Sequence, residues 1–144
     1  MQPKLITMFG VEIRVLTGDL PGDTSTVLDY RAPAQFRGPA EHFHAESSEW
    51  FYVLEGSLAL SVNGEESVAQ VGEYLLVRPR TPHRWSNPFD APVRYLCGFD
   101  RPGMQGYFEE LKKLVASAPA WPPADMTPVH ALAERYDTFA TPAR

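Results

Sequence analysis

The sequence predicts an all-β fold of the sandwich or barrel class, followed by a short helical tail. Between residues 11 and 99 we expect eight or nine short strands at regular spacing, with no helical segment between them. Fourteen prolines and ten glycines among 144 residues indicate the many turns that such a fold needs. The length and the 44% hydrophobic share suit one domain that spans residues 1–144.

The strands are predicted from side-chain alternation and from turn signals. Val11, Ile13 and Val15 alternate with charged residues, which is typical of a half-buried strand. The Asn63–Gly64 pair is the strongest hairpin signal in the chain. The other strands are expected at 24–31, 41–44, 49–54, 58–62, 67–71, 74–77, 83–87 and 93–99.

The apolar spacing changes to a helical pattern after residue 103. An amphipathic helix is predicted from apolar residues at i, i+3, i+4 and i+7, namely Met104, Tyr107, Phe108, Leu111, Leu114 and Val115. Thr127 as N-cap and Pro128 at the first helical position predict a second, shorter helix. This tail, about residues 103–138, is too short for its own core. We therefore expect it to pack outside the barrel core, about residues 11–100, or to close one end.

Three of the four histidines lie at predicted strand starts. His42 and His44 are two residues apart, so on a strand they share one face. Glu49 opens the next strand, and His83 follows a proline-rich turn. An isolated strand histidine is usually a surface or hydrogen-bonded residue. Two histidines on one face, with a carboxylate and a third imidazole nearby, instead favour a site for a first-row divalent metal.

Residues 24–100 resemble the cupin superfamily. The first motif of that superfamily is a His-x-His pair followed by Glu and Gly, and the second is a Gly, a His and then an Asn. The residues that carry the resemblance are His42, His44, Glu49 and Gly56 in the first motif, and Gly72, His83 and Asn87 in the second.

The chain departs from both motifs in their turns. Phe36 stands where the first motif opens with Gly, and Gly38 is the nearest substitute. Arg78 and Arg80 stand at the Pro and Gly positions of the second motif. With Arg84 they form a basic run, which we expect to be a solvated turn; an inward arginine would instead clamp a carboxylate.

The resemblance implies a double-stranded β-helix, or jelly-roll barrel, with one or two short C-terminal helices. It also implies an activity similar to the quercetinase-like group of small metal-dependent dioxygenases, in which a metal-bound Glu removes a proton from the substrate. We therefore expect one divalent ion (Fe, Mn, Ni, Co, Cu or Zn) held by His42, His44, Glu49 and His83. Glu49 is the expected catalytic residue as well.

Two other functions stay open. Related cupins include metal-dependent isomerases, lyases and decarboxylases, and a non-catalytic ligand-binding cupin is the third interpretation. Glu49 itself has alternatives, because it could be a base without being a ligand. Glu41 or Glu46 could also replace it, although strand parity directs Glu41 outward and Glu46 falls in a predicted turn.

Strand parity also predicts a pocket wall beside the ligands. Residues with the parity of Glu49 and His83 should point inward, and these are Phe51, Val53, Trp85 and Asn87. Core packing is the alternative role for these four residues. An aromatic wall next to a metal would suit a small apolar or aromatic substrate. His130 is expected on the polar side of the second helix, at the surface.

Charge and cysteine content limit the expected partners. Thirteen basic and eighteen acidic residues give a net charge of −5, which argues against binding to nucleic acid or to an anionic membrane. The N-terminus lacks a long apolar run that would predict a signal peptide or a membrane span. A single cysteine, Cys97, suits a reducing cytoplasm. We also expect a homodimer that covers an edge strand, with the N-terminal strand as the candidate.

Overall fold

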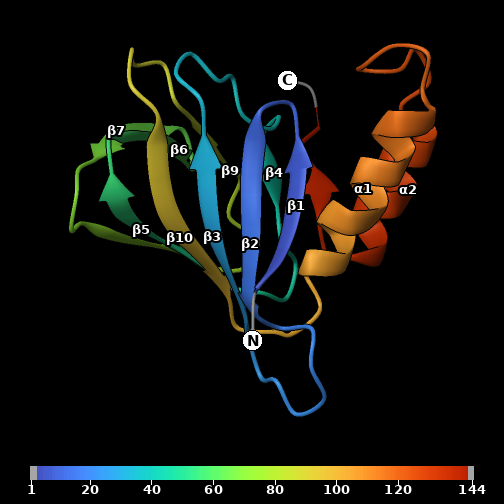
Figure 1. The fold of residues 1–144 in the computed structure, drawn as a ribbon, viewed down its shortest axis with the longest axis horizontal. Helices are drawn as coiled ribbons and strands as arrows, with labels where there is room; N and C mark the ends of the chain where they lie inside the picture. The colour runs from blue at the N-terminus through green and yellow to red at the C-terminus, as the bar shows by residue number, and fades with distance from the viewer. Residues whose placement is uncertain (1–2, 143–144) are drawn as a thin grey trace.

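The computed structural model describes residues 3–142 and contains two antiparallel sheets and two helices (Figure 1). The six-stranded sheet has, in spatial order, β1 (Lys4–Met8), β2 (Val11–Thr17), β3 (Thr26–Ala32), β10 (Val93–Phe99), β5 (Glu49–Glu55) and β8 (Tyr74–Val77). The five-stranded sheet has β11 (Phe139–Ala140), β4 (His42–Phe43), β9 (His83–Ser86), β6 (Leu58–Val62) and β7 (Glu65–Ala69). The helices are α1 (Gln105–Ser117) and α2 (Thr127–Arg135). The predicted all-β class with two C-terminal helices is confirmed.

Side-chain alternation explains how the strands face one core. On β2, Val11, Ile13 and Val15 are buried, whereas Glu12 between them is half-buried and Arg14 is exposed. Strands β5 and β9 alternate in the same way. The central buried residues of the two sheets include Leu28, Phe51, Val53, Leu58, Leu60, Val77, Val93 and Tyr95. Each buried aliphatic or aromatic side chain contributes about 1.5–3 kcal/mol to folding. The packed interior holds the strand ends in place.

Two hairpins have two-residue turns with left-handed backbone. Asn63 and Gly64 join β6 to β7 with φ angles of 51° and 82°, as their sequence predicts. Phe9 and Gly10 join β1 to β2 with φ angles of 54° and 76°. This second hairpin was not expected, because phenylalanine is not a typical residue at a left-handed position. The sequence therefore did not predict strand β1, which this hairpin joins to β2.

The edge of the six-stranded sheet is therefore β1. The predicted N-terminal strand at residues 11–15 lies within β2, which pairs with β1 on one side and β3 on the other. It cannot offer a free edge to a partner. The homodimer stays a prediction, and a dimer formed through the N-terminal edge of this sheet would use β1.

The helical tail packs beside β1 and returns to the sheets. Helix α1 contacts β1 and α2, and α2 leads into β11, so the two helices lie side by side next to β1 (Figure 1). Thr127 is the first residue of α2 rather than its N-cap, so the predicted capping role is wrong. The carboxylate of Asp125 accepts the Thr127 amide at 3.0 Å and satisfies that donor instead.

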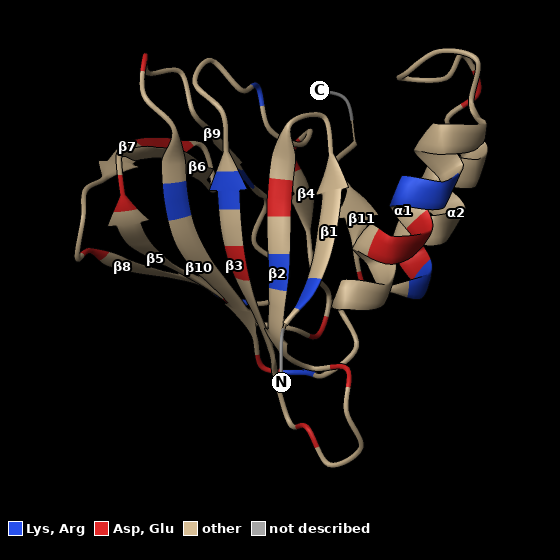
Figure 2. Ribbon diagram, viewed as in Figure 1, with Lys and Arg blue, Asp and Glu red and all other residues tan. Residues whose placement is uncertain are grey.

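Charged residues of both signs lie on the strands of the six-stranded sheet. Figure 2 shows acidic and basic residues side by side on β2, β3 and β10. Arg94 on β10 donates two hydrogen bonds to Asp29 on β3, at 3.0 and 2.8 Å. This mixture of signs agrees with the modest net negative charge of the chain.

Candidate metal centre

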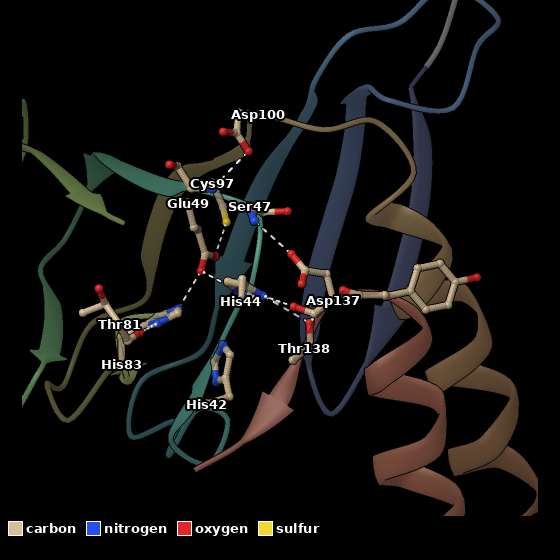
Figure 3. A network of polar contacts seen from close by, with 12 residues as sticks. His42, His44, Ser47, Glu49, Thr81, His83, Cys97, Asp100, Asp137 and Thr138 are labelled. Atoms are coloured by element: carbon tan, nitrogen blue, oxygen red, sulfur yellow. Dashed lines mark hydrogen bonds and ion pairs between the residues drawn. The ribbon is translucent and has the colours of Figure 1, made fainter. Parts of the chain in front are cut away.

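The predicted ligands come together between the two sheets. His42 lies on β4, His44 follows that strand, and Glu49 and His83 open β5 and β9. Strand β4 pairs with β9 so that His42 lies opposite His83. Each of these four residues, His42, His44, Glu49 and His83, offers one ligand atom, and the four atoms lie within 4.8 Å of one another. Figure 3 shows the three imidazoles and the carboxylate directed toward one point.

All three imidazoles have their Nδ1 atom next to a backbone carbonyl oxygen. The distances are 2.8 Å from His42 to Ala40, 3.1 Å from His44 to Asp137 and 2.8 Å from His83 to Thr81. A carbonyl oxygen only accepts hydrogen bonds, so Nδ1 carries a proton in each ring. In a neutral imidazole this leaves the Nε2 lone pair free, which is the form in which histidine binds a metal.

Glu49 lies where those free lone pairs converge. Its Oε1 atom is 3.1 Å from Nε2 of His44 and 2.7 Å from Nε2 of His83. Three acceptor atoms cannot remain so close without a positive charge between them, because none has a hydrogen to share. An additional proton or a metal ion supplies that charge. Three imidazoles and a carboxylate are a fitting donor set for a divalent transition metal.

Burial and mutual contacts shift the pKa values of the cluster. Burial lowers the pKa of His42 to about 4, and the nearby charge of His83 adds to the decrease. Burial raises the pKa of Glu49, but the hydrogen bonds with His44 and His83 outweigh it and hold the pKa well below its usual range. Near neutral pH, His42 is therefore neutral and Glu49 is ionised, as metal binding requires.

The pKa of His44 shifts in the opposite direction. Burial alone would lower it, but the hydrogen bond and the charge of Glu49 outweigh burial, and the pKa lies above its ordinary value of 6.5. Glu49 thus favours the protonated form of His44 in the metal-free protein. A metal ion at Nε2 of His44 would compete with that proton.

Cys97 is a member of the cluster that the sequence did not reveal. Its buried thiol donates a hydrogen bond to Oε2 of Glu49, at a distance of 2.9 Å between sulfur and oxygen. Burial and the adjacent Glu49 charge raise the pKa of the Cys97 thiol, which therefore stays protonated and remains a donor. A signal existed in the alternation of β10, which places Cys97 on the inward face with Tyr95 and Phe99.

The turns beside the ligands explain how the two motif departures are accommodated. Gly38 has φ +75°, and a Cβ atom there would lie 1.9 Å from the carbonyl oxygen of Trp85, so only glycine fits this approach. Arg80 stands at the motif's Gly position and adopts the left-handed φ of 64° that glycine would take. Its amide donates to the His44 carbonyl at 2.6 Å, which ties this turn to the ligands.

The alternative carboxylates lie elsewhere. Glu46 is exposed and pairs with the exposed Arg101 at 2.7 Å. Glu41 lines the cavity described below rather than facing outward. Strand parity does not extend to Glu41, because β4 begins only at His42. The predicted arginine run, Arg78, Arg80 and Arg84, is exposed and does not border that cavity within residues 3–142.

A cavity of about 310 Å³ adjoins the ligand cluster. Its aromatic wall contains Tyr30, Phe36, Trp85, Tyr95 and Phe108, which contact one another with ring centroids 5.2–6.2 Å apart. Residues of both helices also line it, so the tail closes one side of the cavity. His130 is exposed, as predicted, and also borders the cavity.

The four predicted pocket residues are all buried, but they have different surroundings. Trp85 lines the cavity. Phe51 and Val53 lie in the hydrophobic core. Asn87 donates to the carbonyls of Pro33 and Ala91 at 2.9 and 2.8 Å, and so joins two loops. Among the described residues that line the cavity, Phe51, Val53 and Asn87 are absent.

The charged groups around the cavity are acidic. Glu41 and Glu49 line it, and no lysine or arginine from residues 3–142 does so. Within residues 3–142, the cavity therefore offers no lysine or arginine side chain to an anionic ligand. In the described part of the chain, no helix has the length and apolar composition needed to span a membrane.

Curated relatives match part of the chain. TcmJ, a tetracenomycin polyketide synthase protein of Streptomyces glaucescens, is 36% identical over 80 residues, which are 56% of this chain and 54% of that protein. Gentisate 1,2 dioxygenase 1 of Aquipseudomonas alcaligenes is 30% identical over 125 residues, which are 76% of this chain and 36% of that enzyme. The chain thus spans about half or less of the length of these two relatives.

Solved structures share the architecture. A cupin-superfamily sugar phosphate isomerase from Silicibacter pomeroyi has a TM-score of 0.56 and 27% identity, over 65% of this chain and 61% of that one. A cupin protein from Bacteroides fragilis has a TM-score of 0.56 and 23% identity, over 72% of this chain and 87% of that one. Residues 31–99 match the family model described as Cupin domain (Cupin_2). Residues 31–99 are thus similar to the Cupin domain family, and the chain has the cupin fold.

Proposed function

We propose that this chain is a mononuclear metal-dependent dioxygenase that acts on a small, neutral aromatic substrate. The observation that carries the proposal is the convergence of His42, His44, Glu49 and His83 on one point beside a cavity with an aromatic wall. These residues would hold one divalent ion of Fe, Mn, Co, Ni, Cu or Zn. Four protein ligands leave one or two coordination positions open on such an ion, as catalytic sites require.

The protein side of the reaction follows from the positions of the side chains. A bound ion would supply Lewis-acid chemistry and, if redox-active, electrons for reaction with O₂. Glu49 is ionised and lines the cavity, so it is the group placed to exchange a proton with a substrate hydroxyl. The aromatic wall would orient a planar ring by stacking and would exclude water from the site.

The charge of the cavity supports a neutral substrate. Gentisate, the substrate named in one relative, is a carboxylate, and a sugar phosphate is also an anion. Carboxylates and phosphates are commonly held by arginine or lysine, and within residues 3–142 neither residue type lines this cavity. A volume of about 310 Å³ is at the small end for a ligand site, which suits a ligand with one or two rings.

Oxygen uptake with paired substrates tests this proposal. Protein loaded separately with each of the six metals is supplied with neutral phenols and with their carboxylated counterparts, such as hydroquinone and gentisate. We expect the neutral member of each pair to bind at least about tenfold more tightly, because a carboxylate that does not reach the ion would be buried without a lysine or arginine partner, at a cost of more than about 1.4 kcal/mol. We also expect at least one metal to support oxygen consumption with a neutral phenol.

Two results would contradict the proposal. Tighter binding of the carboxylated compounds would exclude the neutral-substrate argument. Substrate conversion that continues at the same rate without O₂ would instead support the metal-dependent isomerase, lyase or decarboxylase alternative. In that case the ligand cluster would still be the site of reaction, but the reaction would not be an oxidation.

A further inference from the structure

The C-terminal end of the described chain lies against the first ligand strand. Strand β11 pairs antiparallel with β4, with Phe139 opposite Phe43 and Ala140 opposite His42. The rings of Phe139 and Phe43 stack at 5.4 Å with an interplanar angle of 20°. This pairing places residues 136–140, which follow α2, directly next to the metal-ligand cluster (Figure 3).

The carboxylate of Asp137 binds three consecutive backbone amides. Oδ1 accepts from Ala45 at 2.9 Å, Oδ2 accepts from Ser47 at 2.9 Å, and both oxygens lie within 3.2 Å of the Glu46 amide. Residues 45–47 form most of the turn that connects His44 to Glu49. Asp137 thus fixes the segment that sets the spacing between two of the four ligand positions.

The backbone of the same residue orients one imidazole. The carbonyl oxygen of Asp137 accepts from Nδ1 of His44 at 3.1 Å. The Thr138 hydroxyl donates to the Tyr136 carbonyl at 3.0 Å, and its oxygen lies 3.2 Å from Nδ1 of His44, so it is a second acceptor for that proton. Asp137 has φ +54°, a left-handed conformation that is uncommon for residues other than glycine.

The carbonyl that binds Nδ1 of His44 comes from a distant part of the chain, unlike the carbonyls that bind His42 and His83. The carbonyls that bind Nδ1 of His42 and His83 belong to Ala40 and Thr81, which are each two residues away in the chain. The partner of His44 is 93 residues away. The ring orientation of His44 therefore depends on the tail, whereas those of His42 and His83 are set by their own strands.

We propose that Asp137 is a positioning residue of the metal centre, which couples the C-terminal segment to the orientation and tautomer of His44. This inference rests on the proposed metal site. The carboxylate of Asp137 holds the 45–47 turn, and its backbone carbonyl accepts the Nδ1 proton of His44. Nε2 of His44 therefore faces the proposed ion. Groups that hydrogen-bond to metal-ligating histidines typically change metal affinity 10–100-fold when they are removed.

The test compares Asp137→Ala, Asp137→Asn and Asp125→Asn with the wild type. Asp125 is a matched control, because its carboxylate also accepts a backbone amide of the tail, at 3.0 Å, but has no contact with a proposed ligand. Affinity for Zn(II) is measured by competition with a chelator, and the visible spectrum of the Co(II) form reports the ligand geometry. We expect Asp137→Ala to weaken Zn(II) binding about tenfold, the lower end of that range, because it releases the 45–47 turn but keeps the backbone carbonyl that binds Nδ1 of His44. Asp137→Asn, which tolerates the left-handed backbone and keeps one acceptor, should weaken it less, and Asp125→Asn should match the wild type.

A second measurement separates this inference from the metal proposal. ¹⁵N NMR of the imidazoles in metal-free protein, at a pH above the pKa of His44 where its ring is neutral, reports whether Nδ1 or Nε2 of His44 carries the proton. We expect the wild type to show the Nδ1-protonated tautomer, and Asp137→Ala and Asp137→Asn to lose part of it. If the wild type binds no metal, the proposed function fails, and the tautomer still tests the role of Asp137.

Wild-type Zn(II) affinity together with an unchanged His44 tautomer in both Asp137 variants would overturn the inference. An equal loss in Asp125→Asn would also overturn it, since the effect would then be one of general stability. If Asp137→Ala does not fold, Asp137→Asn carries the comparison alone.

Discussion

Replacing Glu49 by glutamine removes the negative charge of the ligand cluster while keeping the shape of the side chain. Oε1 of Glu49 makes two contacts with imidazole nitrogens, at 3.1 and 2.7 Å. In the metal-free protein the glutamine amide can donate to one neutral Nε2 atom, and no buried carboxylate has to be desolvated. We therefore expect the free energy of unfolding to change by at most about 2 kcal/mol, which is about 4–8 °C in Tm.

Metal binding should respond much more strongly to the same change. A contact with a charged group is worth about 1.5–3 kcal/mol, so the loss of the carboxylate should weaken metal binding about 10–100-fold. Chelator competition with Zn(II) measures the affinity, and thermal melts of the metal-free forms check the fold. Glu46→Gln is the control, since the Glu46 side chain is exposed and forms an ion pair with the exposed Arg101. Wild-type affinity in Glu49→Gln, or an equal loss in Glu46→Gln, would refute the assignment.

Four further predictions concern pH and packing. Metal affinity should fall as the pH is lowered through the raised pKa of His44, because a proton then competes for Nε2; chelator competition between about pH 6 and 9 measures this, and a flat profile would contradict it. In the metal-free protein, stability should change with pH in the opposite direction. The stabilisation that His44 contributes is complete below pH 6.5 and is lost as the pH rises through its higher pKa in the folded state. Thermal melts over the same pH range measure this. Cys97→Ala removes the thiol donor to Glu49 and should lower the unfolding free energy by about 1–2 kcal/mol in urea titrations, where an unchanged midpoint would count against the contact. Gly98→Ala should lower it by about 1–3 kcal/mol, because its Cβ would lie 2.1 Å from the Trp50 ring; an unaffected variant would show that the ring can move away.

The ligand positions could be predicted because their signals are local in the sequence. The two-residue spacing of His42 and His44 places them on one face of a strand, and the turn signals before His83 mark a second strand start. Strand parity failed at Glu41, because β4 is only two residues long. Strand parity also predicts which side chains point inward, but it does not tell which of them line the cavity and which lie in the hydrophobic core. It therefore did not distinguish Trp85, which lines the cavity, from Phe51, which lies in the core.

The residues that surround the ligands could not be predicted in the same way. Asp137 and Thr138 reach His44 from more than 90 residues away, and only the return of the tail along β4 brings them there. A two-residue strand such as β11 has too little sequence to show a pattern. Cys97 has the expected inward parity, but its contact with Glu49 depends on the pairing of β10 with β5.

The metal content of the purified, untagged protein tests the central claim most directly. Inductively coupled plasma mass spectrometry is applied to the wild type, His44→Ala and His130→Ala, with His130 as the histidine outside the ligand cluster. We predict about one equivalent of a transition metal per chain in the wild type and in His130→Ala, and a loss of that metal in His44→Ala. Little metal in the wild type after reconstitution with Fe(II), Mn(II), Ni(II) and Zn(II), or full metal content in His44→Ala, would contradict the proposed centre.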